Sequence, residues 1–247
     1  MTRLRTFNAY LSEARYETLR MLRTPAFAAP FLVIPGALYL LFAVVIFGPQ
    51  LRDDPVSSLK MFAGLTVLGM MGPGMFGFGT TVAIEREQGL LKLKQALPMP
   101  SGAYLLSKMI MTLVFCTIIM GTMIVAALFA GHLKLSASAM VLFAIANILG
   151  SLPFCALGLL LGAWVSGASA PGFVNLIYLP MMWLSGLFFP MPKYVQAFAP
   201  IWPSYHLLQI SFGILGLPSL GGVVSHFSVL VVVSIVLFVL AVRRLAR

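Results

Sequence analysis

The sequence has very little charge for its length, and acidic residues are its scarcest charged side chains. Only 9% of the 247 residues are Asp, Glu, Lys or Arg, and six of them are acidic. An average soluble domain is about one quarter charged, whereas this chain is 60% hydrophobic with a mean hydropathy of +1.01. So few polar groups cannot cover a protein surface in water, which excludes a soluble globular protein. We therefore expect lipid to surround most of the chain.

Several hallmarks of enzymes and ion-driven carriers are also missing. The two cysteines, Cys116 and Cys155, both lie in apolar runs, so we expect buried thiols with no disulfide and no metal site. No Gly-x-x-x-x-Gly-Lys-Ser/Thr motif occurs, so the chain is expected to lack an ATPase site of its own and to hold no cofactor. We find no ionisable residue deep in an apolar run, which argues against a proton- or sodium-driven carrier and against a channel with a charged ring.

Two short motifs that could indicate a site are rejected on their context. Residues 72–77 formally match Gly-x-Gly-x-x-Gly, but no strand precedes them, and we expect these glycines to allow close helix packing. An intramembrane protease would need a serine and a histidine at matching depth. Ser169 and His226 are expected at opposite ends of the bundle, and we interpret His132, His206 and His226 as outer interfacial residues.

Six apolar runs predict an all-α integral membrane protein with a single transmembrane domain over residues 1–247. The first run has a length of about 33 Å at 1.5 Å per residue, enough to cross a hydrocarbon core of about 30 Å. The fourth run ends in Gly158 and Gly162, a spacing that lets two helices approach closely. The predicted spans are residues 26–47, 61–84, 109–130, 139–161, 173–189 and 225–242.

Two further segments are expected to be helical without crossing the membrane. Residues 6–23 predict an amphipathic helix on the membrane surface; they are too long and too amphipathic for a secretory signal. Residues 190–224 are apolar but broken by prolines and glycines, and they predict short re-entrant helices near 194–200 and 204–215 on the outer side. The apolar face expected for the first segment comprises Phe7, Tyr10, Leu11, Ala14, Thr18, Met21 and Leu22.

The distribution of basic residues predicts the topology. Twelve of the sixteen lysines and arginines fall on one side of the predicted spans and four on the other. Because basic loops stay in the cytoplasm, both termini and residues 85–100 are expected inside the cell. The net charge of +10 is attributed to this bias and to membrane lipids, and not to nucleic acid. The four basic residues assigned to the outer side are Arg52, Lys60, Lys134 and Lys193.

Residues 85–100 form a polar interruption that is longer than a turn between two helices needs to be. Gly89 can end the second span, and Pro98 and Pro100 can bound a short helix after it. Leu91 and Leu93 give that helix an apolar side. It is either a plain solvated loop with basic residues or a surface for a soluble partner, and we favour the second interpretation.

Two sequence patterns resemble the membrane subunits of ABC-2 type exporters. The first is the Glu-Arg-Glu-x-Gly-x-Leu run at residues 85–91 after the second span. The second is the Leu-Ser-Gly-Leu-Phe-Phe-Pro run at 184–190, followed by Pro200 and the turn at 203–206. Together with six spans and an amphipathic N-terminal helix, the resemblance covers essentially the whole chain.

The resemblance implies a permease that exports a hydrophobic or amphipathic substrate across a bacterial inner membrane. Two copies would pair as a homodimer, with the first, second and fifth spans as walls of the substrate path. Two P-loop ATPase subunits, which carry ATP and magnesium, would dock beneath them. The alternative is a structural or assembly membrane protein without transport. The residues implied in ATPase binding are Glu85, Arg86, Glu87, Gly89, Leu91 and Leu93 in the loop, and Arg15, Tyr16 and Arg20 in the N-terminal helix.

Overall fold

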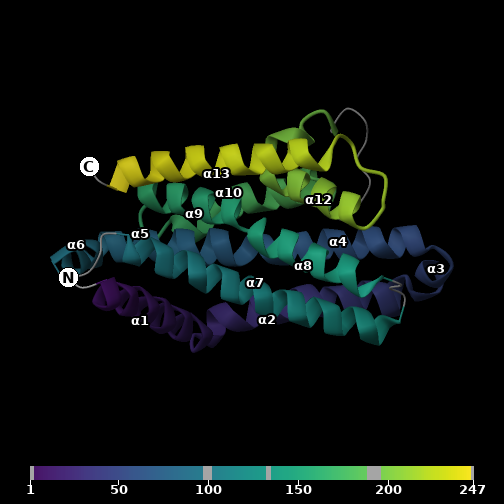
Figure 1. The fold of residues 1–247 in the computed structure, drawn as a ribbon, viewed down its shortest axis with the longest axis horizontal. Coiled ribbons are helices and arrows are strands. Elements are labelled where there is room, and N and C mark those ends of the chain that lie inside the picture. The colour runs from purple at the N-terminus through teal and green to yellow at the C-terminus, as the bar shows by residue number, and fades with distance from the viewer. Residues whose placement is uncertain (1–2, 97–101, 132–134, 188–195, 246–247) are drawn as a thin grey trace.

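A bundle of long helices makes up the computed structural model, which describes residues 3–96, 102–131, 135–187 and 196–245 (Figure 1). These residues contain no strand. The elements are α1 (Arg3–Leu22), α2 (Pro25–Leu40), the π-helix η1 (Leu41–Ile46), α3 (Gly48–Asp53), α4 (Pro55–Gly72), the π-helix η2 (Pro73–Thr80), α5 (Thr81–Glu87), α6 (Leu90–Ala96), α7 (Ala103–Ala130), α8 (Ala137–Leu149), α9 (Leu152–Trp164), α10 (Ala170–Leu184), the 3₁₀ helix η3 (Ala199–Ile201), α12 (Pro203–Ile214) and α13 (Val223–Leu245).

Five apolar helices among the described residues are long enough to cross a membrane. The fifth predicted span, 173–189, corresponds to α10, which has only 15 residues; residues 188–189 lie outside the described part. The second span begins at Pro55 and not at residue 61, because Asp54 caps it by accepting from Val56 N and Ser57 N at 3.1 Å each. The five helices are Pro25–Ile46, Pro55–Glu87, Ala103–Ala130, Ala137–Trp164 and Val223–Leu245.

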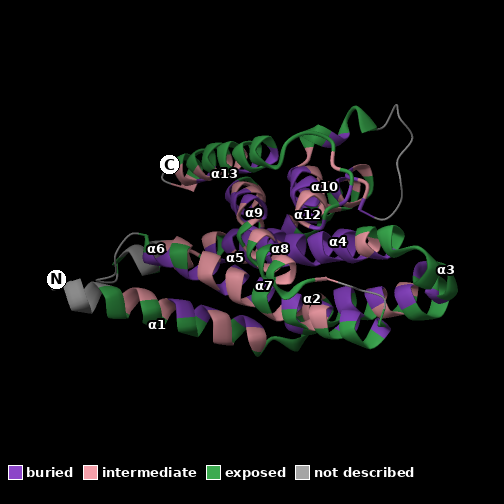
Figure 2. Ribbon diagram, turned by 45° about the vertical axis from the view of Figure 1, so that its right-hand side comes forward, coloured by how far each residue is buried: buried purple, intermediate pink, exposed green. Residues whose placement is uncertain are grey.

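The continuous helix α4–η2–α5 is the centre of the bundle. Of the 18 residues in its most apolar stretch, 89% are buried, whereas the corresponding share in α13 is 11%. Figure 2 shows α4 mostly in the colour of buried residues beyond its start beside α3, with the other helices around it. A helix that is apolar on all sides must be covered by other helices or by lipid, and here other helices cover most of it. The side chains of Phe62, Met70, Met71, Met75 and Phe78 are fully buried along it.

Glycines allow α9 to lie directly against η2. A Cβ atom on Gly158 would lie 2.5 Å from the carbonyl oxygen of Gly74, and one on Gly79 would lie 2.8 Å from that of Gly158. Gly162 faces the Gly79 carbonyl in the same way. Close packing is therefore confirmed as the role of the glycine pair 158/162, as it is for Gly74 of the Gly-x-Gly-x-x-Gly match.

Hydrogen bonds within the protein hold the buried side chains of Ser204, Gln209 and Ser211 in α12. Ser211 pairs with Asn147 of α8, with 3.0 Å between Ser211 Oγ and Asn147 Nδ2, and Ser204 bonds to Ser185 after α10 at 2.5 Å between the hydroxyls. The Gln209 side-chain oxygen accepts from Leu220 N at 2.7 Å. A short helix is thus found where one was predicted at 204–215, although part of the region before it lies outside the described residues.

The bundle has two distinct ends. The start of α1, the helix α6 and the end of α13 lie together at one end in both views, which we call the α6 end (Figures 1 and 2). Helix α3 and the connection between α12 and α13 lie at the opposite end, the α3 end. Helix α1 runs along the bundle toward α2 in both views and not across it, so the expected placement flat on a membrane surface is not confirmed.

Candidate functional site

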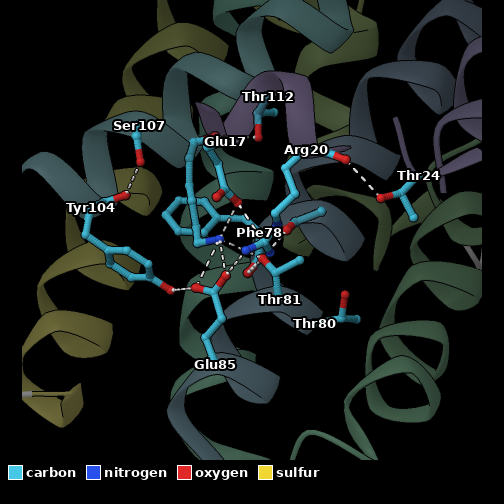
Figure 3. A network of polar contacts seen from close by, with 12 residues as sticks. Glu17, Arg20, Thr24, Phe78, Thr80, Thr81, Glu85, Tyr104, Ser107 and Thr112 are labelled. Atoms are coloured by element: carbon cyan, nitrogen blue, oxygen red, sulfur yellow. Dashed lines mark hydrogen bonds and ion pairs between the residues drawn. The ribbon is translucent and has the colours of Figure 1, made fainter. Parts of the chain in front are cut away.

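Five side chains from three helices form a buried network near the α6 end, which we call the ionic cluster (Figure 3). Helix α1 contributes Glu17 and Arg20, α5 contributes Glu85, and α7 contributes Tyr104 and Lys108. Glu17 and Glu85 are 4% and 3% exposed, and Lys108 is fully buried. Charges at such depth need partners, because removing an ion from water is costly.

Lys108 is the centre of the ionic cluster. Its Nζ lies 2.6 Å from Oε1 of Glu17 and 3.3 Å from Oε2 of Glu85. The same ammonium donates to the hydroxyl of Thr81 at 3.1 Å. An ammonium has three protons to donate, so all of its donor capacity is used and α1, α5 and α7 are joined at one atom.

Glu85 is held from two more sides. The Nη1 atom of Arg20 lies 2.7 Å from Glu85 Oε1, and the Tyr104 hydroxyl donates to Glu85 Oε2 at 2.6 Å. Two carboxylates thus face two cations, and the ionic cluster is formally neutral. A balanced set of paired charges, three of them buried and Arg20 half-exposed, fixes the relative positions of its helices, because shifting one helix would leave a charge unpaired.

Arg20 closes the ionic cluster on its solvent side, with a side chain that is 49% exposed. Burial works against the charge on its guanidinium, but the carboxylates of Glu17 and Glu85 outweigh this effect and raise the Arg20 pKa above its ordinary value. The group therefore stays charged at any physiological pH and keeps Glu85 compensated.

The buried face of α1 explains why Glu17 points inward. Ala14, Glu17 and Met21 are buried and recur every three to four residues, the spacing of one helix face. Of the apolar face predicted from the sequence, Ala14 and Met21 pack inside the bundle, whereas Phe7 and Leu11 are 66% and 58% exposed. An acidic residue lies on the packed face because Lys108 on α7 compensates it.

Beyond the ionic cluster, the two residues after Glu85 bind the turn between α9 and α10. Arg86 donates to the carbonyl oxygens of Ala163 and Val165, the latter at 2.7 Å, and so satisfies carbonyl groups at the C-terminal end of α9. The Glu87 carboxylate accepts from Gly167 N at 2.6 Å. We call these contacts the α9 clamp.

Helix α6 follows directly from this anchored segment. Gly89 adopts φ +73° after α5 ends, as a C-terminal glycine should. The chain then turns into the seven residues of α6. Leu91 packs on the cluster of Phe78, Val82 and Tyr104, whereas Leu93 is 64% exposed. One leucine therefore seats α6 on the bundle and the other points outward.

The predicted partner-binding residues fall into two groups. Arg15, Tyr16 and Leu93 are exposed and free to meet a partner, with Tyr16 71% exposed. Glu85 and Arg20 belong to the ionic cluster, Arg86 and Glu87 to the α9 clamp, and Gly89 and Leu91 shape and seat α6. The inward orientation of Glu85 makes it a positioning residue for α6.

The sequence interpretation missed Glu17, Tyr104 and Lys108. Lys108 was assigned to a polar lead-in before the third span, but α7 begins at Ala103 and places it inside the helix, fully buried. The available signal was the position of Glu17 three residues after Ala14 and four before Met21, on one helix face.

Comparison with known proteins agrees with this architecture. Residues 9–216 match the family described as ABC-2 type transporter. The chain is also 26% identical over 202 residues to the Bacillus subtilis (strain 168) protein named "Putative transport permease YvfS", a match that covers 81% of this chain and 82% of that protein.

Proposed function

The chain belongs to the ABC-2 type transporter family, and we propose that it is the permease subunit of an exporter whose ATPase is a separate chain that docks on α6. The observation that carries this proposal is the support given to α6. A seven-residue helix, too short to be stable by itself, follows an anchored segment and presents Leu93 to solvent. Such a surface suits a soluble partner better than a plain loop.

The ionic cluster and the α9 clamp give that docking a mechanical consequence. The end of α5, which leads into α6, contacts α1 and α7 through Glu85. It contacts the turn between α9 and α10 through Arg86 and Glu87. A displacement imposed on α6 by ATP binding would therefore move four helices together. ATP and magnesium belong to the partner in this proposal, and the α1 residues Arg15 and Tyr16 form a second contact.

Six crossings with both termini in the cytoplasm fit the arrangement of the ends. The start of α1 and the end of α13 share the α6 end, which an even number of crossings produces. Helix α10 supplies the sixth crossing beside the five longer spans. Residues 196–224 form the described part of the re-entrant region on the outer side, and the burial of Leu207, Leu208 and Ser211 of α12 inside the protein suits a segment that dips into a membrane.

The exposed apolar surfaces of the spans support a hydrophobic or amphipathic substrate. Helix α10 exposes Phe173, Leu176 and Trp183, and the α2–η1 span exposes Val33 and Val45. A second copy of the chain and two ATPase copies would complete a bacterial inner-membrane exporter, with these faces beside a path for hydrophobic or amphipathic molecules. Lipid covers the remaining apolar surface.

Co-purification with an ATPase tests the proposal. Tagged chain extracted from its native membrane should bring down a protein with a P-loop, and the complex should hydrolyse ATP. Leu93→Asp should remove most of this activity. Val56→Asp makes the same kind of change at a 45% exposed site in the first turn of α4 and should leave the activity unchanged.

Two results would contradict the proposal. One is recovery of a folded chain with no nucleotide-hydrolysing partner, which would favour a structural or assembly protein. The other is full ATPase recovery with Leu93→Asp, which would place the docking surface elsewhere.

A further inference from the structure

Two histidines meet at the α3 end of the bundle, where α12 and α13 begin. His206 and His226 are each the fourth residue of their helix and each 7% exposed. Their Nδ1 atoms lie 2.8 Å apart, within hydrogen-bond distance. Sequence interpretation treated both as ordinary interfacial residues, and the proposed export function makes no use of them.

The other nitrogen of each ring fixes the proton count of the pair. His206 Nε2 lies 2.9 Å from the Pro200 carbonyl oxygen, and His226 Nε2 lies 2.6 Å from the Leu220 carbonyl oxygen. A carbonyl oxygen can only accept, so both Nε2 atoms carry hydrogen. In two neutral rings both Nδ1 atoms would then be bare acceptors with facing lone pairs. A hydrogen bond between them requires one additional proton.

We propose that His206 and His226 form a proton-binding site that holds one shared proton between the two Nδ1 atoms, and that this proton joins α12 to α13. The pair is then an imidazolium hydrogen-bonded to a neutral imidazole, with a total charge of +1. This claim does not depend on the proposed export function.

The surroundings of the pair favour a single proton over two. Burial lowers the pKa of His206, the Pro200 carbonyl opposes this effect, and His226 adds to it. The Tyr205 ring packs against both imidazoles, with centroid distances of 5.4 and 5.9 Å.

Among the described residues, the elements that pack against the pair carry few fixed charges. The sequences of α8, η3, α12 and the connection 215–222 contain no Asp, Glu, Lys or Arg, and α13 has none before Arg243. Lys60, the charged residue of α4 before its π-helical part, is exposed. We therefore expect the pair to respond mainly to the pH at this end of the bundle.

The site makes the contact between α12 and α13 dependent on pH in both directions. A second proton would place two cations in contact, and loss of the shared proton would place two lone pairs in contact. Either change would separate the starts of the two helices. Helix α12 also packs on α4 and α8. We therefore expect the contact between α12 and α13 to be most stable in the singly protonated state.

Nitrogen NMR of the full chain, labelled with ¹⁵N-histidine in lipid nanodiscs, tests the proton count. A His132→Gln background leaves only the pair to observe, because the chain has three histidines. Near neutral pH we expect one imidazolium and one imidazole with hydrogen on Nε2, or their exchange average, with a coupling across the Nδ1–Nδ1 contact. Two neutral rings, or two imidazolium rings, would overturn the proposal.

A second measurement keeps the test independent of the NMR sample. Thermal unfolding of the wild type should show an acid loss of stability that is reduced in both His206→Gln and His226→Gln, because glutamine does not titrate. His132→Gln should keep the wild-type profile. Identical pH profiles for the wild type and both pair variants would contradict the proposal.

Discussion

Lys108 of α7 and Glu17 of α1 form a buried ion pair with 2.6 Å between Nζ and Oε1, although 91 residues separate them in the sequence. This contact ties α1 to the bundle and supplies the charge that Glu85 also needs. The segment that leads into the proposed docking helix α6 is therefore held by contacts among three helices. The stability that these contacts contribute can be measured directly.

Replacement of Lys108 by methionine should destabilise the protein strongly. Methionine has a similar volume, but Glu17 and Glu85 would remain buried with Arg20 as their one cationic partner in the ionic cluster. Breaking a buried ion pair by removing one partner costs about 3–5 kcal/mol. Thermal or denaturant unfolding in detergent measures the loss.

A second variant separates charge from packing. Glu17→Gln together with Lys108→Met removes one charge of each sign, so this double variant should recover part of the stability lost by Lys108→Met alone. The Glu17→Gln single variant completes the cycle, and a loss in the double variant equal to the sum of the two single losses would mean that the charges are not coupled.

Replacement of Arg86 by lysine should loosen the turn between α9 and α10. Lysine keeps the charge but lacks the planar fork that donates to Ala163 and Val165 at once. Hydrogen bonds of charged groups contribute about 1.5–3 kcal/mol, and we expect the loss of one such bond. Hydrogen exchange should accelerate at residues 163–169 and stay unchanged in α12; equal protection in both proteins would refute the α9 clamp.

Replacement of Gly158 by alanine should weaken the contact between α9 and η2. The new Cβ would lie 2.5 Å from the Gly74 carbonyl oxygen, which belongs to backbone and cannot rotate away. Overpacking of this kind costs about 1–3 kcal/mol. Gly121→Ala is the matched control, because nothing lies within 4 Å of its Cβ, and it should be neutral or slightly stabilising; the same loss in both variants would contradict the packing account.

The start of α4 should lose its cap in acid. Hydrogen bonds from the Ser57 hydroxyl and backbone, and then from Val56 N, hold the Asp54 pKa below its ordinary value. A lowered pKa in the folded state stabilises the protein above the unfolded value of about 3.9. This contribution is lost as the pH falls through the folded pKa. Asp54→Asn can still cap the helix and should show a smaller acid loss; equal acid profiles would exclude this role for Asp54.

The sequence predicted the parts of this protein that depend on hydropathy and local geometry. Apolar runs identified the long helices, Gly89 marked the end of α5, and the spacing of Gly158 and Gly162 indicated close packing. Each of these signals is local, and lipid-facing helices must satisfy their backbone within a single segment.

The ionic cluster could not be predicted in the same way, because its members come from three helices. Lys108 and Glu17 each look like ordinary solvated charges within their own segments, and only tertiary packing pairs them. His206 and His226 also lie in separate helices, and only tertiary packing brings them together. The helix of the second span extends beyond the predicted boundary at residue 61, because a cap at Asp54 carries Lys60 into the helix.

Site-specific photo-crosslinking at position 93 tests the central claim most directly. A photoreactive phenylalanine analogue at Leu93 in the native membrane should crosslink to a P-loop ATPase, identified by mass spectrometry. The same analogue at Leu128, which is 74% exposed in a span, should not. Failure of Leu93 to crosslink to an ATPase, or equal crosslinking from both positions, would contradict the assignment of α6 as the docking helix.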